Sequence, residues 1–269
     1  MMSIIAANLK LNGYEKGIGV NVLDLFSGIG GFSLGLESTG FFKTVGFCEQ
    51  DKFCQKVLRK HWKDVPIYED IKTLDARKIQ ADVVVGGFPC QSFSIAGKQK
   101  GKDDERYLWD EMFRVIKEAK PRWIIGENVQ NLTNISNGQI LQGIHNDLES
   151  QGYEVQTFNI SANSQGAWHK RARIWIVAAN TKKNVWNSES TGLQSSFNRQ
   201  RKREFWRTST PREQCQRTWW QIESELCGVP DGVCYGLDKG RANRIKALGN
   251  SIVPQIIKEI GLAIYETEK

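Results

Sequence analysis

Short apolar runs alternate with longer amphipathic stretches over the first two thirds of the chain, and this alternation limits the fold more than any other feature. The apolar runs, which we expect to be strands, are residues 20–26, 43–49, 81–87, 121–129, 153–160 and 172–180. The amphipathic stretches between them, which we expect to be helices, are residues 30–40, 51–62, 108–120 and 138–152. This spacing predicts an α/β fold with a doubly wound, mostly parallel sheet. In such a sheet, ligands bind beyond the carboxyl ends of the strands.

Composition excludes several classes of protein. The chain of 269 residues is long enough for one full core and a small second domain. No apolar run approaches the roughly 20 residues that a membrane helix needs, and the N-terminus lacks the apolar core of a signal peptide. We therefore expect a cytoplasmic protein with no membrane partner. Six cysteines without paired spacing, beside three histidines, favour neither a disulfide framework nor a metal site.

The alternating pattern breaks at about Thr181, where a polar segment rich in Arg, Trp, Ser and Gln begins. Its basic residues, including Arg201, Lys202 and Arg203, are interleaved with tryptophans, as suits phosphate contacts and base stacking. A solvated loop is the alternative interpretation. We divide the chain into a catalytic domain (1–180), a small recognition region (181–240) and a C-terminal segment (241–269). The apolar face of residues 251–266 is expected to pack back on the sheet.

Two features suggest an adenosine-containing cofactor. The first predicted strand ends in the glycine turn "FSGIGG", which allows a ligand to approach the backbone closely. Glu49 ends the second predicted strand, where an acidic side chain can accept hydrogen bonds from ribose hydroxyls. Tight packing alone is the alternative explanation for the glycines.

Cys90 and Glu127 follow two other predicted strands. Cys90 comes directly after Pro89, past the apolar run, which favours a displayed nucleophile over a small core residue. Partial burial of Glu127 at the same edge would raise the pKa of its carboxyl and let it donate a proton. Together they fit nucleophilic attack on an electron-poor ring. The charged, glycine-containing stretch after Cys90 is a candidate lid.

The motifs "DLFSGIGGFSLGLE", "GGFPCQSFS", "ENV", "HKRAR" and "ALGNSIVPQ" occur in this order. With them the chain resembles the DNA (cytosine-5)-methyltransferase family of bacteria and phages, over about residues 20–179 and from Ala247 to the last helix. The resemblance implies the fold of methyltransferases that depend on S-adenosyl-L-methionine. It also implies methyl transfer to carbon 5 of a flipped-out cytosine in a specific double-stranded DNA sequence.

The resemblance assigns roles to individual residues. Cys90 would add to the cytosine ring, Glu127 and Arg173 would hold the ring, and Arg171 would order the site. The residues that it places on the cofactor are Phe26, Gly28, Gly30, Gly31, Glu49, Asp70, Pro89, Asn250 and Ser251. The residues that we expect on DNA, from the lid and the basic segment, are Gln91, Ser94, Lys98, Gln99, Arg201, Lys202 and Arg203.

The chain departs from the family pattern at two positions. His169 stands where glutamine is usual, and Gln50 stands where some relatives have an aromatic residue. An RNA cytosine-5 methyltransferase and an inactive DNA-binding relative remain alternatives, although the chain has no Cys-Phe-Thr tripeptide of the transfer-RNA branch. A nicotinamide-dependent oxidoreductase would explain the glycines and Glu49 but not the Pro-Cys and Glu-Asn-Val segments together. We expect a monomer, with a cognate restriction endonuclease acting separately.

Overall fold

The computed structural model describes residues 19–89, 108–167, 170–180 and 241–267. Its strands form one sheet in the order β3-β2-β1-β4-β5-β7-β6. The bounds are β1 (Val20–Leu25), β2 (Phe42–Cys48), β3 (Ile67–Tyr68), β4 (Val83–Gly86), β5 (Trp123–Val129), β6 (Tyr153–Ser161) and β7 (Ala172–Asn180). Strands β1 to β5 pair in parallel, whereas β7 runs antiparallel to both β5 and β6. The predicted mostly parallel α/β sheet is confirmed.

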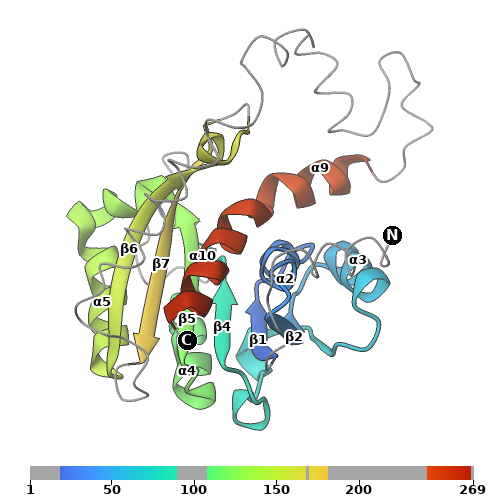
Figure 1. The fold of residues 1–269 in the computed structure, drawn as a ribbon, viewed down its shortest axis with the longest axis horizontal. Coiled ribbons are helices and arrows are strands. Elements are labelled where there is room, and N and C mark those ends of the chain that lie inside the picture. The colour runs from blue at the N-terminus through green and yellow to red at the C-terminus, as the bar shows by residue number, and fades with distance from the viewer. Residues whose placement is uncertain (1–18, 90–107, 168–169, 181–240, 268–269) are drawn as a thin grey trace, which may run out of the picture.

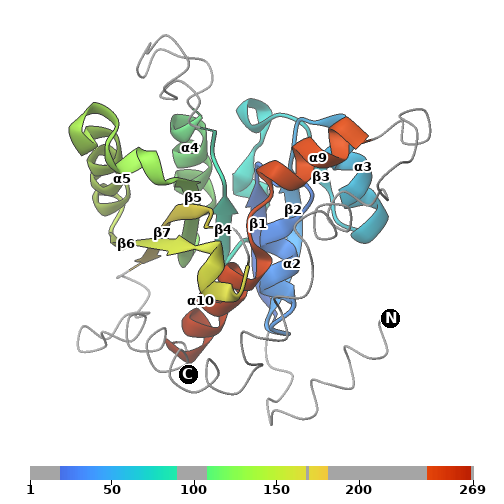
Figure 2. The same cartoon turned by 90° about the horizontal axis from the view of Figure 1, so that it is seen from above.

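Helices cover both faces of the sheet (Figures 1 and 2). Helices α4 (Trp109–Ala119) and α5 (Gln139–Ser150) lie over one face, and α2 (Gly31–Glu37) and α10 (Pro254–Thr267) lie over the other. Helix α3 (Lys52–His61) lies beside the edge formed by β2 and β3, and α9 (Arg241–Asn250) crosses beyond the carboxyl ends of the parallel strands. The 3-10 turns are η2 (Ile71–Thr73), η3 (Ala76–Lys78), η6 (Gln130–Thr133), η7 (Ile135–Gly138) and η8 (Ala162–Gln165).

Strand β4 shows how the two faces are filled. Val83, Val84 and Val85 are all fully buried. Val84 belongs to the core under α4 and α5, while Val83 and Val85 belong to the core under α2 and α10. A strand covered on both faces needs a continuous apolar run rather than an alternating one, and the run "ADVVV" meets that need. Strand β4 is therefore buried on both faces.

The C-terminal helix packs back on the first half of the domain, as expected. Helix α10 buries Ile256, Ile257, Ile260 and Ile264, and it lies against α2. The two helices approach so closely that a Cβ atom added at Gly35 would lie 2.5 Å from the carbonyl oxygen of Pro254. A glycine on α2 is therefore required by packing at this crossing.

Most predicted elements begin and end within three residues of the observed ones. Helix α9 was not predicted as a helix, because its apolar residues do not mark one buried face: Ile245 and Leu248 are 45% and 51% exposed. The basic segment 181–240 and the lid after Cys90 lie outside the described residues, so their predicted roles stay predictions. Within the described part of the chain, no helix is long and apolar enough to span a bilayer.

Candidate functional site

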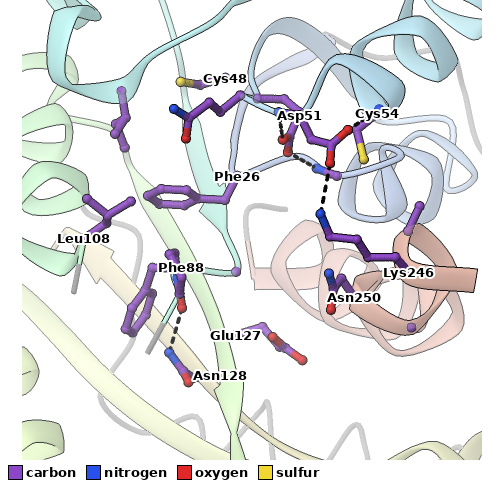
Figure 3. Close-up of a pocket in the computed structure, with 18 of the residues that line it drawn as sticks. Phe26, Cys48, Asp51, Cys54, Phe88, Leu108, Glu127, Asn128, Lys246 and Asn250 are labelled. Atoms are coloured by element: carbon purple, nitrogen blue, oxygen red, sulfur yellow. Dashed lines mark hydrogen bonds and ion pairs between the residues drawn. The ribbon is translucent and has the colours of Figure 1, made fainter. Parts of the chain in front are cut away.

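A cavity of about 1120 Å³ opens at the carboxyl ends of β1, β2, β4 and β5. These ends include the point between β1 and β4 where the strand order reverses, which is where doubly wound sheets bind their ligands. The residues predicted for the site that line this cavity are Phe26, Gly28, Glu49, Asp70, Pro89, Glu127, Arg171, Arg173 and Asn250. Figure 3 shows Phe26 in the middle of the cavity, with Asp51 and Lys246 on one side and Glu127 and Asn128 on another.

The turn after β1 has an unusual backbone. Phe26, Gly28 and Gly30 have φ values of 52°, 55° and 85°, in the left-handed region. This region is open to glycine but costs a residue with a Cβ atom about 1–2 kcal/mol, so the surrounding structure must stabilise Phe26 there. The strained turn directs the aromatic ring of Phe26 into the cavity (Figure 3).

Gly30 and Gly31 have a packing role. A Cβ atom at Gly30 would lie 2.7 Å from the Trp62 ring, and one at Gly31 would lie 2.8 Å from the Ser251 hydroxyl oxygen. Among the described residues that line the cavity, neither glycine nor Ser251 is present. The packing alternative for these two glycines therefore has direct geometric support, whereas Gly28 lines the cavity and has open space beside it.

Glu49 joins the glycine turn to the start of α3. One carboxylate oxygen accepts a hydrogen bond from the Gly28 N–H at 2.7 Å, and the other accepts one from the Asp51 N–H at 2.7 Å. Asp51 in turn caps α3 by accepting from the N–H groups of Phe53 and Cys54. Each Glu49 oxygen keeps a further lone pair, so the carboxylate can still accept hydrogen bonds from two hydroxyl groups.

Asp70 and Ile71 form the wall of the cavity that follows β3. One oxygen of Asp70 accepts a hydrogen bond from the Lys72 N–H at 2.9 Å and caps η2. Its carboxylate is an acceptor for the amine and hydroxyl donors of a nucleoside. Two carboxylates and an aromatic ring around a cavity of this volume fit an adenosine-containing cofactor. The residues present are therefore compatible with S-adenosyl-L-methionine.

Glu127 lies on β5, and Arg173 lies near the start of the neighbouring antiparallel strand β7, where its register partner is Val129. The Arg173 Nε atom is 3.2 Å from the Glu127 Oε1 atom, and only 12% of the Glu127 side chain is exposed. Burial raises the pKa of the Glu127 carboxyl above its ordinary value, although the positive charges of Arg173 and Arg171 oppose that shift. The predicted direction of the pKa shift is confirmed. A carboxyl in this setting can hold a proton and donate it.

Arg171 connects this glutamate region to the C-terminal segment. Its guanidinium donates to the carbonyl oxygens of Gly249 at 2.9 Å and Ser251 at 2.7 Å. Burial lowers the pKa of Arg171, as does the charge of Arg173, while Glu127 raises it. Because Asn250 lies between the two carbonyls that Arg171 holds, Arg171 helps to fix the C-terminal end of α9, where Asn250 lines the cavity.

Asn128 is a site residue that sequence reasoning missed. Its side-chain amide is 4% exposed and donates to the Phe88 carbonyl oxygen at 3.0 Å, and its amide oxygen accepts from the Val129 N–H at 2.8 Å (Figure 3). Phe88 directly precedes Pro89 and Cys90 in the sequence. The available signal was a buried amide directly beside Glu127 at a strand end, since such a group requires a hydrogen-bond partner.

Several predicted residues lie outside the part of the chain that the structure describes. They are Cys90, Gln91, Ser94, Lys98, Gln99, His169, Arg201, Lys202 and Arg203. Their assigned roles remain predictions.

Comparison with known proteins agrees with the fold and the motifs. The sequence profile of the family described as C-5 cytosine-specific DNA methylase matches residues 20–225. The chain is 42% identical to the type II methyltransferase M1.ScrFI of Lactococcus lactis subsp. cremoris over 60% of this chain and 42% of that protein. It is 36% identical to the type II methyltransferase M.HhaI of Haemophilus parahaemolyticus over 63% of this chain and 52% of that protein. The chain thus spans about half the length of these curated relatives.

Solved structures show the same fold. A prophage-encoded protein of E. coli, solved as a candidate DNA modification methyltransferase, superposes with a TM-score of 0.55 and 26% identity over 64% of this chain and 49% of that chain. The Entamoeba histolytica methyltransferase EhMeth superposes with a TM-score of 0.64 over 94% of this chain and 100% of that one, at 15% identity. Because the profile match covers most of the sequence, in line with the sheet order and the cavity at its switch point, the chain belongs to the C-5 cytosine-specific DNA methylase family.

Proposed function

We propose that this protein transfers a methyl group from S-adenosyl-L-methionine to carbon 5 of a cytosine in double-stranded DNA. The observation that carries the proposal is that one cavity holds two different groups of polar residues, one at each end. Glu49 and Asp70 offer carboxylate acceptors at one end, and Glu127 with Arg173 offers a proton donor and a cation at the other. The family membership and the relatives named as type II methyltransferases support the same reaction.

The cofactor end is built from Phe26, Gly28, Glu49 and Asp70. Glu49 would accept hydrogen bonds from the ribose hydroxyls, and Asp70 would accept one from the adenine amine. S-adenosyl-L-methionine, when bound, supplies an electrophilic methyl group carried on a sulfonium. The Phe26 ring would contact that cation with its face, which is worth about 0.5–2 kcal/mol.

The cytosine end uses Glu127 and Arg173. The raised pKa of Glu127 favours its protonated form, which can hold or donate a proton at ring nitrogen 3. The Arg173 guanidinium, which is always charged, would bind the exocyclic oxygen. Protonation at nitrogen 3 withdraws electrons from the ring and makes carbon 6 electrophilic.

Cys90 supplies the nucleophile in this proposal. Its thiolate would form a bond to carbon 6, and the electron pair of the carbon 5–carbon 6 double bond would make carbon 5 nucleophilic. Carbon 5 then takes the methyl group. Loss of the carbon 5 proton to a base, with departure of the Cys90 thiolate, restores the double bond and releases the enzyme.

The target base must leave the duplex, because the carbons of cytosine are inaccessible inside the base stack. The basic segment 181–240 and the lid after Cys90 would contact the DNA, and their positive charge would make binding dependent on salt.

A methyl-transfer assay with labelled cofactor tests the proposal, with duplex DNA and transfer RNA as parallel substrates. Label is expected in duplex DNA at carbon 5 of cytosine for the wild type and in neither substrate for Cys90→Ala, which should still bind the cofactor. Transfer to RNA alone would favour the RNA cytosine-5 methyltransferase. Transfer by Cys90→Ala at the wild-type rate would refute the covalent mechanism.

A further inference from the structure

We infer that Arg114, on the far side of the cofactor wall, is a positioning residue that holds Asp70 and Ile71 in the geometry needed to bind the adenosine part of the cofactor. This inference rests on the proposed function. Among the described residues that line the cavity, Arg114 is absent. It acts instead through the backbone of the segment that contains η2.

Arg114 lies on α4 and reaches the segment that contains η2. Its guanidinium donates to the carbonyl oxygen of Ile71 at 2.5 Å and to that of Leu74 at 2.9 Å. Ile71 and Leu74 lie 43 and 40 positions away from Arg114 in the sequence, so the contact joins two separate parts of the chain. The Ile71 carbonyl also accepts a hydrogen bond from the Leu74 N–H at 3.3 Å, which closes the turn. The guanidinium therefore adds a second donor to the Ile71 carbonyl and supplies one to the Leu74 carbonyl.

Two carboxylates on the same helix fix the guanidinium. Glu111 accepts from Arg114 Nε at 2.9 Å, and Glu118 accepts from Arg114 Nη1 at 2.8 Å. The second oxygen of Glu118 also accepts from the Ala76 N–H at 3.0 Å. The segment from Ile71 to Ala76 is thus attached to α4 at three backbone groups. Because Arg114 and Glu118 are themselves paired, the attachment is a rigid network of charge-assisted hydrogen bonds.

The attached segment forms one wall of the cavity. Asp70, Ile71 and Lys72 line the cavity, and Asp70 caps the turn whose Ile71 carbonyl Arg114 holds. Rotation of this turn would move the Asp70 carboxylate and the Ile71 side chain together. A shift of about 1 Å in a binding group is enough to weaken a directional contact strongly.

Helix α4 also supports the other end of the cavity. Its first residue, Trp109, packs against Phe88 with ring centroids 5.2 Å apart. Phe88 is the residue whose carbonyl Asn128 holds, and it lies two positions before Cys90. The same helix therefore contacts both the adenosine wall and the strand end that leads to the nucleophile.

Titration calorimetry with S-adenosyl-L-methionine and with 5′-methylthioadenosine, which lacks the amino-acid end, tests the inference. Arg114→Met removes the donors but keeps an apolar stem. We expect it to weaken binding of both ligands by about 10- to 100-fold, because a displacement of about 1 Å in a binding group has an effect of that size. Arg114→Lys keeps the charge but not the planar fork, so its affinity should lie between those of Met and wild type. At saturating cofactor, the turnover number of Arg114→Lys should stay within about threefold of wild type, because the substitution raises the KM for the cofactor and not the barrier to methyl transfer.

Arg77→Ala is the matched control. Arg77 is an exposed cation of the attached segment that pairs with Asp75. This variant should bind the two ligands within about twofold of wild type, which is the size expected for an exposed ion pair. If the wild type binds S-adenosyl-L-methionine and the Arg114→Met and Arg114→Lys variants bind it with the same dissociation constant, the inference about Arg114 is refuted but the proposed function is not. A wild type that binds no cofactor would refute the proposed function and this inference together.

Discussion

Gly35→Ala tests the close crossing of α2 and α10. The added Cβ atom would lie 2.2 Å from the Cγ2 atom of Ile257 and 2.5 Å from the carbonyl oxygen of Pro254. The Ile257 side chain can rotate, but the Pro254 carbonyl is backbone at the start of α10. To restore ordinary contact at 3.4 Å or more, α10 must move away from α2 by about 1 Å.

The magnitude follows from two opposing effects. Overpacking against backbone costs about 3 kcal/mol, the upper end of the usual range. Alanine stabilises a helix interior by about 1 kcal/mol over glycine. The expected net loss of unfolding free energy is therefore about 2 kcal/mol. Cofactor affinity should fall as well, because only residues 251–253 separate α10 from Asn250 at the end of α9.

Urea unfolding, followed by circular dichroism, measures the effect. Gly143→Ala is the matched control, since Gly143 lies inside α5 and a Cβ atom there meets nothing within 4 Å. That substitution should stabilise the protein by about 0.5–1 kcal/mol. If Gly35→Ala were as stable as Gly143→Ala, α10 would not lie against α2 as described, and the account of the C-terminal segment would be wrong.

Three further predictions concern the strand ends and the basic segment. Asn128→Ala leaves the Phe88 carbonyl without the Asn128 donor, which should lower the unfolding free energy measured in urea by about 1–3 kcal/mol. The substitution should also slow single-turnover methyl transfer more than it weakens cofactor binding, and an unchanged rate would contradict this role. Burial raises the pKa of Asp24 to about 8 from 3.8, so the folded state keeps a proton that the unfolded state releases. The contribution of Asp24 to the unfolding free energy should therefore fall as the pH rises between these values. Asp24→Asn should remove that contribution, and a variant whose unfolding free energy changes with pH in parallel with the wild type would contradict the assignment. Alanine at all three positions 201–203 should weaken DNA binding and flatten its dependence on salt, as measured by fluorescence anisotropy, and an unchanged slope would mean that these residues face away from DNA.

The sheet was predictable because its signals are local. A run of three valines favours a strand that is buried on both faces, and Asp51 stands directly before the helix that it caps. The order of motifs after the strands then predicted which residues meet at one edge. Phe26, Glu49, Asp70 and Glu127 do share one cavity.

The residues that support the site were not predictable, because their contacts join distant parts of the chain. Arg114 and Asn128 act on carbonyl oxygens that lie 43 and 40 positions away. Helix α9 has exposed apolar side chains, and the segment around it is fixed by contacts that no local pattern reveals: Arg171 with the Gly249 carbonyl, and Lys246 with Asp51. All the glycines of the turn were assigned to cofactor binding, because a sequence does not distinguish a glycine that makes room for a ligand from one that makes room for a neighbouring side chain.

Bisulfite sequencing of DNA from methylation-deficient bacteria that express the protein tests the central claim most directly, since it reports both the activity and the target sequence. The wild type is expected to protect cytosines within one defined sequence context. Cys90→Ala should protect none, whereas Cys54→Ala, which changes a cysteine that lines the cavity, should keep the wild-type pattern. Protection by Cys90→Ala equal to that of the wild type, or no protected cytosine in cells that contain folded wild-type protein, would contradict the account.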